Sequence, residues 1–131
     1  MDTEAFKQQL QALRKELTEA DYFALILDRL DKDPSTDERN ILEISLGAYA
    51  SVDPARVAKY WEPFLSSNDA FQRETAAREL SLLVDSFSDP LAYRLLTEFF
   101  GQEPKPDKLD DILRERMLQL FPGYKQGRYR S

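Results

Sequence analysis

The oxygen-bearing side chains from Asp31 to Ser35 are spaced like the first ligands of a calcium-binding loop. Asp31, Asp33 and Ser35 occupy alternate positions, so their oxygen atoms could converge on one hard cation. The rest of the pattern does not fit, because Thr36 stands where such a loop needs glycine and Leu42 where it needs a bidentate glutamate. The segment therefore predicts a capped turn between two helices rather than a metal site.

A second group of acidic residues lies at the start of the last predicted helix and comprises Asp107, Asp110, Asp111 and Glu115. Negative charge is favoured at the N-terminus of a helix by the helix macrodipole, so capping accounts for these carboxylates. An enzyme that used only carboxylates or tyrosines would need two acids converging in one pocket. The acids of this chain fall at caps and turns instead.

Cysteine and histidine are both absent from the chain. Their absence excludes a Ser-His-Asp triad, a Cys-His pair, a facial triad and a zinc hydrolase site. It also removes disulfide bonds and the side chain most often used as a general base near neutral pH. We therefore expect a protein that is not an enzyme and that binds no cofactor and no metal.

Charge is distributed unevenly over a chain whose net charge is −6. Residues 16–53 contain 10 acidic side chains against 3 basic ones, a local balance of −7, whereas residues 122–131 contain Lys125, Arg128 and Arg130 and no acid. Complementary charge speeds encounter between proteins and adds specificity. The acidic half therefore predicts a basic protein partner, and it argues against nucleic acid, whose phosphates need clustered Lys and Arg.

Tyr60 and Trp61 are adjacent aromatic residues within a predicted helix. Successive residues of a helix point about 100° apart, so the two rings cannot be equally buried, and one of them is expected at the surface. Exposed Tyr and Trp side chains commonly anchor protein interfaces. The candidate partner-binding residues combine this pair with acidic residues of the N-terminal half: Asp28, Asp31, Asp33, Asp37, Glu38, Tyr60 and Trp61.

Apolar residues recur at spacings of three and four along most of the chain, which predicts helices, and no segment shows the alternation of a strand. No run of about 18 apolar residues indicates a membrane span, and the first residues lack a signal-peptide pattern. No membrane association and a cytoplasmic location are therefore expected. About seven helices are predicted, over residues 3–17, 18–30, 35–50, 54–65, 69–87, 90–100 and 107–121.

Capping residues mark several of the predicted helix starts. Ser35 and Glu38 have the spacing of a capping box, in which the Ser hydroxyl accepts a hydrogen bond from the Glu backbone N–H. Asp53, Asp69 and Asp89 each stand where a carboxylate can cap the next helix. We expect all three aspartates at helix N-termini.

The chain aligns with itself at an offset of 34 residues, which places Arg39 on Arg73 and Leu42 on Ala76. At a further offset of 37 residues, the apolar positions of the helix over residues 69–87 align with those of the last predicted helix, over residues 107–121. Each repeat is a helix, a short polar turn and a second helix. Equivalent positions on the second helices are expected to be buried, and they are Leu42, Leu46, Leu80, Leu83, Leu113 and Met117.

The middle repeat resembles a HEAT repeat. In that family a proline bends the first helix, an aspartate lies in the turn, and an arginine precedes small and aliphatic residues of the second helix. The matching residues here are Pro63, Asp69, Arg73, Ala76, Ala77 and Leu80. The first repeat keeps Arg39 but has no such proline, and the third has Asp110 where the arginine is expected.

This resemblance covers residues 19–121 and implies an all-α fold, a short right-handed α-solenoid of about three HEAT-like helical hairpins with an N-terminal capping helix. The chain would then be one helical domain over residues 1–121, followed by a basic tail over residues 122–131. Stacked hairpins share a continuous apolar core that a single hairpin cannot form. A compact seven-helix bundle is the alternative.

The expected function is that of a protein–protein interaction module. Size, charge and the absence of catalytic residues resemble those of small acidic bacterial immunity and antitoxin proteins, which neutralise basic nuclease toxins by covering their active sites. One alternative is a nucleic-acid-binding HEAT-like protein that uses residues 122–131, whose basic and aromatic side chains suit single-stranded nucleic acid. Another is an adaptor or scaffold subunit.

Overall fold

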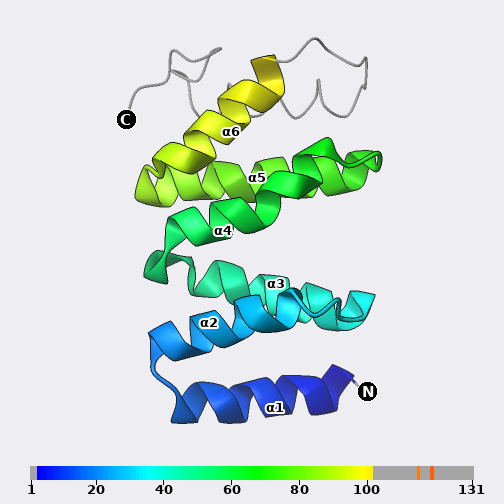
Figure 1. Ribbon diagram of the computed structural model, residues 1–131, viewed down its shortest axis with the longest axis vertical. Helices are drawn as coiled ribbons and strands as arrows, with labels where there is room; N and C mark the ends of the chain where they lie inside the picture. The colour runs from blue at the N-terminus through cyan, green and yellow to red at the C-terminus, as the bar shows by residue number, and fades with distance from the viewer. Residues whose placement is uncertain (1–2, 102–114, 116–118, 120–131) are drawn as a thin grey trace. The chain divides into compact units, whose positions relative to one another are not determined.

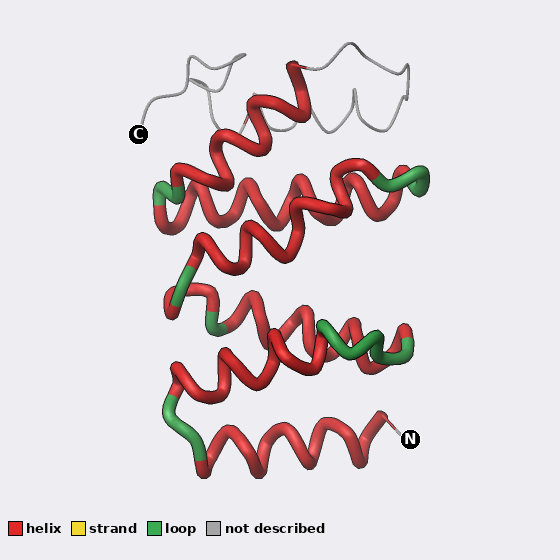
Figure 2. The backbone as a smooth tube through the Cα atoms, viewed as in Figure 1, coloured by secondary structure: helices red, strands yellow, loops and turns green. Residues whose placement is uncertain are grey.

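The computed structural model describes residues 3–101, Glu115 and Gln119. Over these residues the structure is helical and contains no strand, which confirms the predicted all-α class (Figures 1 and 2). The α-helices are α1 (Thr3–Glu16), α2 (Glu19–Leu30), α3 (Thr36–Ala48), α4 (Pro54–Trp61), α5 (Ala70–Phe87) and α6 (Pro90–Gly101). Two 3₁₀ segments follow α3 and α4, namely η1 (Ala50–Val52) and η2 (Glu62–Ser66).

Six α-helices are thus described where about seven were predicted. The predicted helix over residues 107–121 lies outside the described residues except at Glu115 and Gln119, which are helical. Leu113, Met117, three members of the acidic group (Asp107, Asp110 and Asp111) and the basic tail over residues 122–131 also lie outside the described residues. In the described part of the chain, no helix is long and apolar enough to cross a membrane.

The chain divides into two compact units, Met1–Asp53 and Pro54–Ser131, and each is described by itself. In the first unit α1, α2 and α3 pack against one another, and in the second α4 packs against α5 and α6, which also contact each other. The division falls at the boundary between the first and second predicted hairpins, within a chain that was predicted to be one domain. Both units are made of consecutive helices that run back and forth (Figure 2).

The predicted capping residues begin the helices. The Ser35 hydroxyl accepts a hydrogen bond from the Glu38 backbone N–H at 3.3 Å. Asp69 Oδ1 accepts one from the Phe71 backbone N–H at 3.0 Å, and Asp89 Oδ2 one from the Ala92 backbone N–H at 2.9 Å. Asp53 stands directly before α4, so all three predicted aspartates lie at helix N-termini.

Replacing Asp89 with alanine is expected to lower the free energy of unfolding by about 1 to 2 kcal/mol, because this cap is buried and the Ala92 N–H would lose its acceptor. Asp69→Ala is the matched control, since it removes the same kind of cap at an exposed site. Chemical denaturation measures both. A loss at Asp89 no larger than the loss at Asp69 would contradict the importance of burial.

Pro63 shapes the connection between α4 and α5. The α-helix ends at Trp61, and residues Glu62–Ser66 continue as a 3₁₀ segment with the proline in its first turn. Proline has no backbone N–H, and its ring clashes with the carbonyl of the preceding helical turn. The α-helix therefore ends before Pro63, and the chain continues as a 3₁₀ segment.

The core of each unit contains the predicted leucines. Leu42 and Leu46 of α3 are fully buried in the first unit, and Leu80 and Leu83 of α5 are buried in the second. Phe23 and Ile26 of α2 join the first core, and Leu96 of α6 joins the second. The expectation of buried side chains at these four positions is confirmed.

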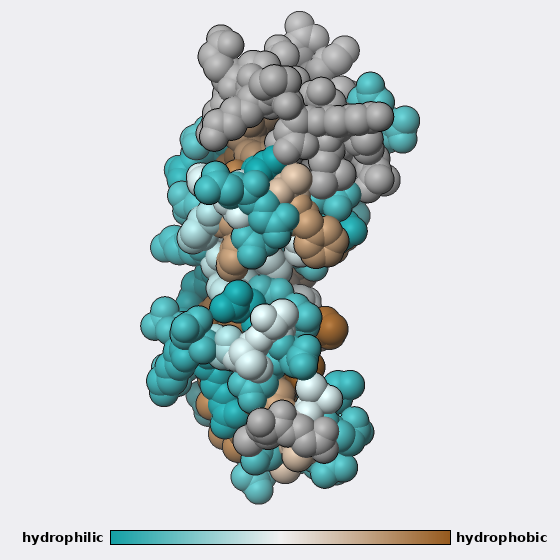
Figure 3. All heavy atoms as spheres, turned by 90° about the vertical axis from the view of Figure 1, so that its right-hand side faces the viewer, coloured by the Kyte–Doolittle hydropathy of each residue, from teal (hydrophilic) through white to brown (hydrophobic). Residues whose placement is uncertain are grey.

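Three large apolar residues of α3 and α5 lie at the surface. Ile44 is 75% exposed, Phe71 is 65% exposed and Phe87 is 40% exposed. Ile44 stands two positions from both Leu42 and Leu46, a rotation of about 200°, so it points away from the core. Phe71 and Phe87 lie near the two ends of α5. On the face shown in Figure 3, hydrophobic side chains are scattered among hydrophilic ones.

The turns of the hairpins α2–α3 and α4–α5 share their spacing, although Asp33 has a left-handed backbone and Ser67, 34 residues on, an extended one. Their second helices begin at Thr36 and Ala70, which preserves the offset of 34 residues. Arg39 lies 3.4 Å from the Asp33 carboxylate, and Arg73 donates a 2.7 Å hydrogen bond to the Ser67 carbonyl oxygen. Each arginine thus contacts the residue six positions before it. Local contacts as well as residue types recur at this spacing.

Candidate functional site

Five predicted partner-binding residues lie at the turn between α2 and α3, and we call them the acidic turn: Asp28, Asp31, Asp33, Asp37 and Glu38. The structure brings them together because α2 ends and α3 begins within this short segment (Figure 1). The four aspartates are exposed and Glu38 is half-buried, and the Glu38 backbone N–H donates to the Ser35 hydroxyl that caps α3. The acidic turn is thus open to a partner.

Basic residues offset part of this charge. Lys32 Nζ lies 3.0 Å from Asp28 Oδ2, and Arg39 pairs with Asp33. Residues 28–39 contain five acidic and three basic side chains, a balance of −2. Asp31 and Asp37 form no ion pair with the described residues, so their carboxylates are the ones most open to an incoming cation.

The remaining acids of residues 16–53 lie elsewhere in the first unit. Glu16, Glu19 and Asp21 are exposed at the turn between α1 and α2, at the other end of α2. Glu43 belongs to α3, and Asp53 follows η1. The balance of −7 counted along the sequence is therefore spread over the first unit, and the acidic turn carries only −2 of it.

Asp33 gives the acidic turn its backbone geometry. Its φ of 52° lies in the left-handed region, where aspartate and asparagine are tolerated better than other residues with a side chain. Pro34 follows and excludes a helical conformation before it. The chain therefore reverses at this point, and an Asp33→Asn substitution removes the charge without disturbing the turn.

The aromatic pair belongs to the second unit. Trp61 is buried at 4% exposure, whereas Tyr60 is half-buried. Their ring centroids lie 5.0 Å apart, and Phe64 completes the cluster at 5.5 Å from Tyr60 and 5.6 Å from Trp61. Trp61 thus packs inside its own unit, and Tyr60 is the member of the pair that reaches the surface.

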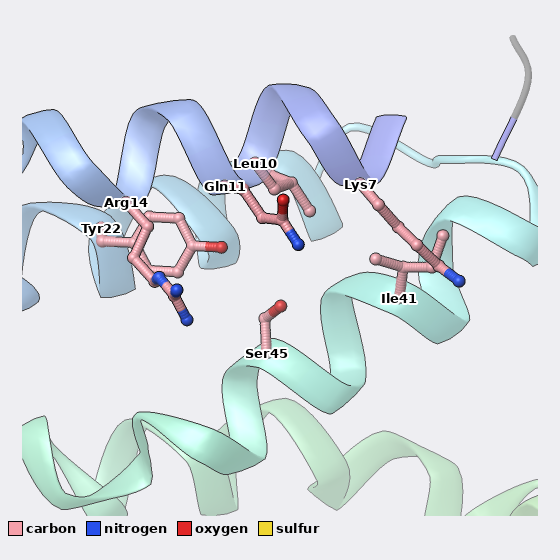
Figure 4. Close-up of a pocket in the computed structure, with 7 residues that line it drawn as sticks. All are labelled: Lys7, Leu10, Gln11, Arg14, Tyr22, Ile41 and Ser45. Atoms are coloured by element: carbon pink, nitrogen blue, oxygen red, sulfur yellow. The ribbon is translucent and has the colours of Figure 1, made fainter. Parts of the chain in front are cut away.

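A polar hollow in the first unit was not predicted. It has a volume of about 190 Å³, opens between α1 and α3, and is lined by Lys7, Leu10, Gln11, Arg14, Tyr22, Ile41 and Ser45 (Figure 4). The signal that points to it is the spacing of Lys7, Gln11 and Arg14 at four and three residues, which puts them on one flank of α1. That flank adjoins the apolar stripe of the same helix.

The polar groups of the hollow face its interior. The Tyr22 hydroxyl points into it, and the Gln11 amide and Ser45 hydroxyl face each other across it, with Lys7 and Arg14 toward its two ends (Figure 4). The Tyr22 ring is held edge-on against Tyr49 at 5.1 Å. Among the described residues, no carboxylate lines the hollow. Its two cations form no ion pair with the described residues.

In the described part of the chain, no three acidic side chains converge as metal ligands would. Comparison with protein-family models, with curated proteins and with solved structures gives no match for this chain.

Proposed function

We propose that this chain is a non-catalytic protein–protein interaction module whose acidic turn binds a basic protein. The observation that carries the proposal is the gathering of five carboxylates at one turn, with Asp31 and Asp37 exposed and outside any ion pair with the described residues. Such charges steer a cationic partner to the surface and fix its orientation. The partner expected is of the kind neutralised by acidic immunity or antitoxin proteins.

An apolar anchor stands beside the acidic turn. Ile44 is 75% exposed and follows Asp37 by seven residues on α3. Seven residues make about two turns, so both side chains lie on the same face of the helix. A few anchor contacts provide most of the binding energy of an interface, while surrounding charges provide its on-rate. Asp37 and Ile44 together supply both elements.

The proposed architecture is a short HEAT-like solenoid. The equally spaced turns of α2–α3 and α4–α5 support it, since each places a cap and an arginine contact at the same offset. In this proposal α6 and the predicted helix over residues 107–121 form a third hairpin, and α1 caps the first. Stacked hairpins would bury the apolar stripes that each exposes alone.

Photocrosslinking tests the proposed surface. A photoreactive benzoylphenylalanine at Asn40, which is exposed between Asp37 and Ile44, should crosslink a strongly basic protein in the cells that produce this chain. The crosslink should weaken as salt rises, because salt screens exposed charges. Ala24 is the matched control position, since it is exposed on α2 and outside the acidic turn.

The captured protein is then purified and its binding to the full chain measured directly. A neutral or acidic protein at Asn40, or equal crosslinking from Ala24, would contradict the proposal. The nucleic-acid alternative uses residues 122–131, which lie outside the described residues, so the acidic turn remains the better supported site.

A further inference from the structure

We infer that the polar hollow between α1 and α3 binds carboxylate groups of an acidic protein segment. The inference does not depend on the acidic turn, which faces a partner of opposite charge. It rests on the donor set of the hollow, its size and the spacing of its two cations.

The donor set selects an anion. Lys7 and Arg14 carry positive charge, and the Gln11 amide, Tyr22 hydroxyl and Ser45 hydroxyl can each donate a hydrogen bond. A cationic ligand would meet two positive charges, and no carboxylate of the described lining residues would balance them. An anion would receive charge-assisted hydrogen bonds, which are about twice as strong as neutral ones. Both cations form no ion pair with the described residues, so a ligand need not displace one.

The size of the hollow favours a side chain over a free metabolite. At about 190 Å³ it is smaller than the pockets of about 300 to 1,000 Å³ that enclose small-molecule ligands. One carboxylate with a short methylene stem fits such a space while the chain that bears it stays outside. Leu10 and Ile41 supply apolar contacts for the stem. A glutamate side chain combines both features.

The spacing of the cations suggests how the segment lies. Lys7 and Arg14 are seven residues apart on α1, a rise of about 10.5 Å along the helix. A segment in the polyproline II conformation advances about 9 Å over three residues and brings the side chains of residues i and i+3 to the same side. Two glutamates three residues apart can therefore reach both cations when the segment lies along α1. The Arg14 end, with Gln11, Tyr22 and Ser45 nearby, offers the fuller set of donors.

NMR titration of the ¹⁵N-labelled full chain tests this assignment. The probe is the peptide acetyl-Glu-Gly-Gly-Glu-amide, and the reporters are the Gln11 side-chain amide and the Ser45 backbone amide. We expect a saturable shift at both reporters. Arg14→Gln should weaken binding by about tenfold, since it removes one charge-assisted contact. Lys15→Gln is the matched control, because Lys15 is an exposed cation on α1 that does not line the hollow.

Four outcomes would overturn the inference. They are the absence of a saturable shift, equal binding of acetyl-Gln-Gly-Gly-Gln-amide, equal weakening by Lys15→Gln, and binding of glutarate or inorganic phosphate as tight as that of the peptide. The last outcome would make the hollow a site for small free anions. Binding by the Glu peptide alone, lost on Arg14→Gln and kept on Lys15→Gln, supports an acidic segment.

Discussion

Replacing Leu80 with alanine is expected to lower the free energy of unfolding of the second unit by about 2 to 5 kcal/mol. Leu80 is fully buried near the middle of α5, the helix that α4, η2 and α6 all contact. Alanine would remove the apolar area that leucine buries and would leave a cavity that packed neighbours fill only in part. The lost apolar burial and the cavity both weaken the packing of α5.

The measurement uses a probe that the chain already contains. Trp61 is the only tryptophan and is buried in the same unit, so its fluorescence during chemical denaturation follows this unit. Leu82→Ala is the matched control, because Leu82 is 52% exposed on the same helix and surface changes usually alter stability by about 0.5 kcal/mol or less. If Leu80→Ala cost no more than that, the assignment of the core would be wrong.

Signals that act over a few residues predicted most of the described fold. The Ser35 and Asp69 caps and the stripes through Leu46 and Leu80 all depend on residues within about one or two helical turns. Local chemistry decides such features before any long-range packing is known. The helix boundaries agree with the prediction to within a few residues for the same reason.

The exposure of a side chain near a helix end depends on tertiary contacts. Apolar spacing along the sequence does not predict those contacts. Phe71 and Phe87 fit the apolar spacing of α5, yet both are exposed. Adjacency showed that Tyr60 and Trp61 must differ in burial, but only packing decides that Trp61 is the buried one.

The candidate sites differ in how far sequence could locate them. The acidic turn is a contiguous segment, so its carboxylates were found by counting, although the ion pairs of Asp28 and Asp33 were not. The hollow joins Arg14 of α1 to Tyr22 of α2 and Ser45 of α3. No short window contains that combination, and only the packing of three helices brings it together.

Replacing Asp28, Asp31 and Asp33 with asparagine is expected to slow association with the basic partner about tenfold at low salt. The substitutions leave two acidic and three basic side chains in residues 28–39, so the local balance changes from −2 to +1. The turn now repels the cation that it attracted. The fold should tolerate the change, since the lost ion pairs are exposed and asparagine suits the left-handed backbone of residue 33.

The off-rate should change little, because exposed charges act mainly on encounter, while Ile44 would hold the formed complex. Stopped-flow association at increasing salt measures the effect. The difference in on-rate between the variant and the wild type should shrink as the Debye screening length falls to about 8 Å at physiological salt. The control triple variant Glu16→Gln, Glu19→Gln and Asp21→Asn changes the net charge equally, at the other end of α2. Equal slowing in both variants would show that only net charge matters. An unchanged on-rate in the first variant would place the interface elsewhere, with Tyr60 as the next candidate.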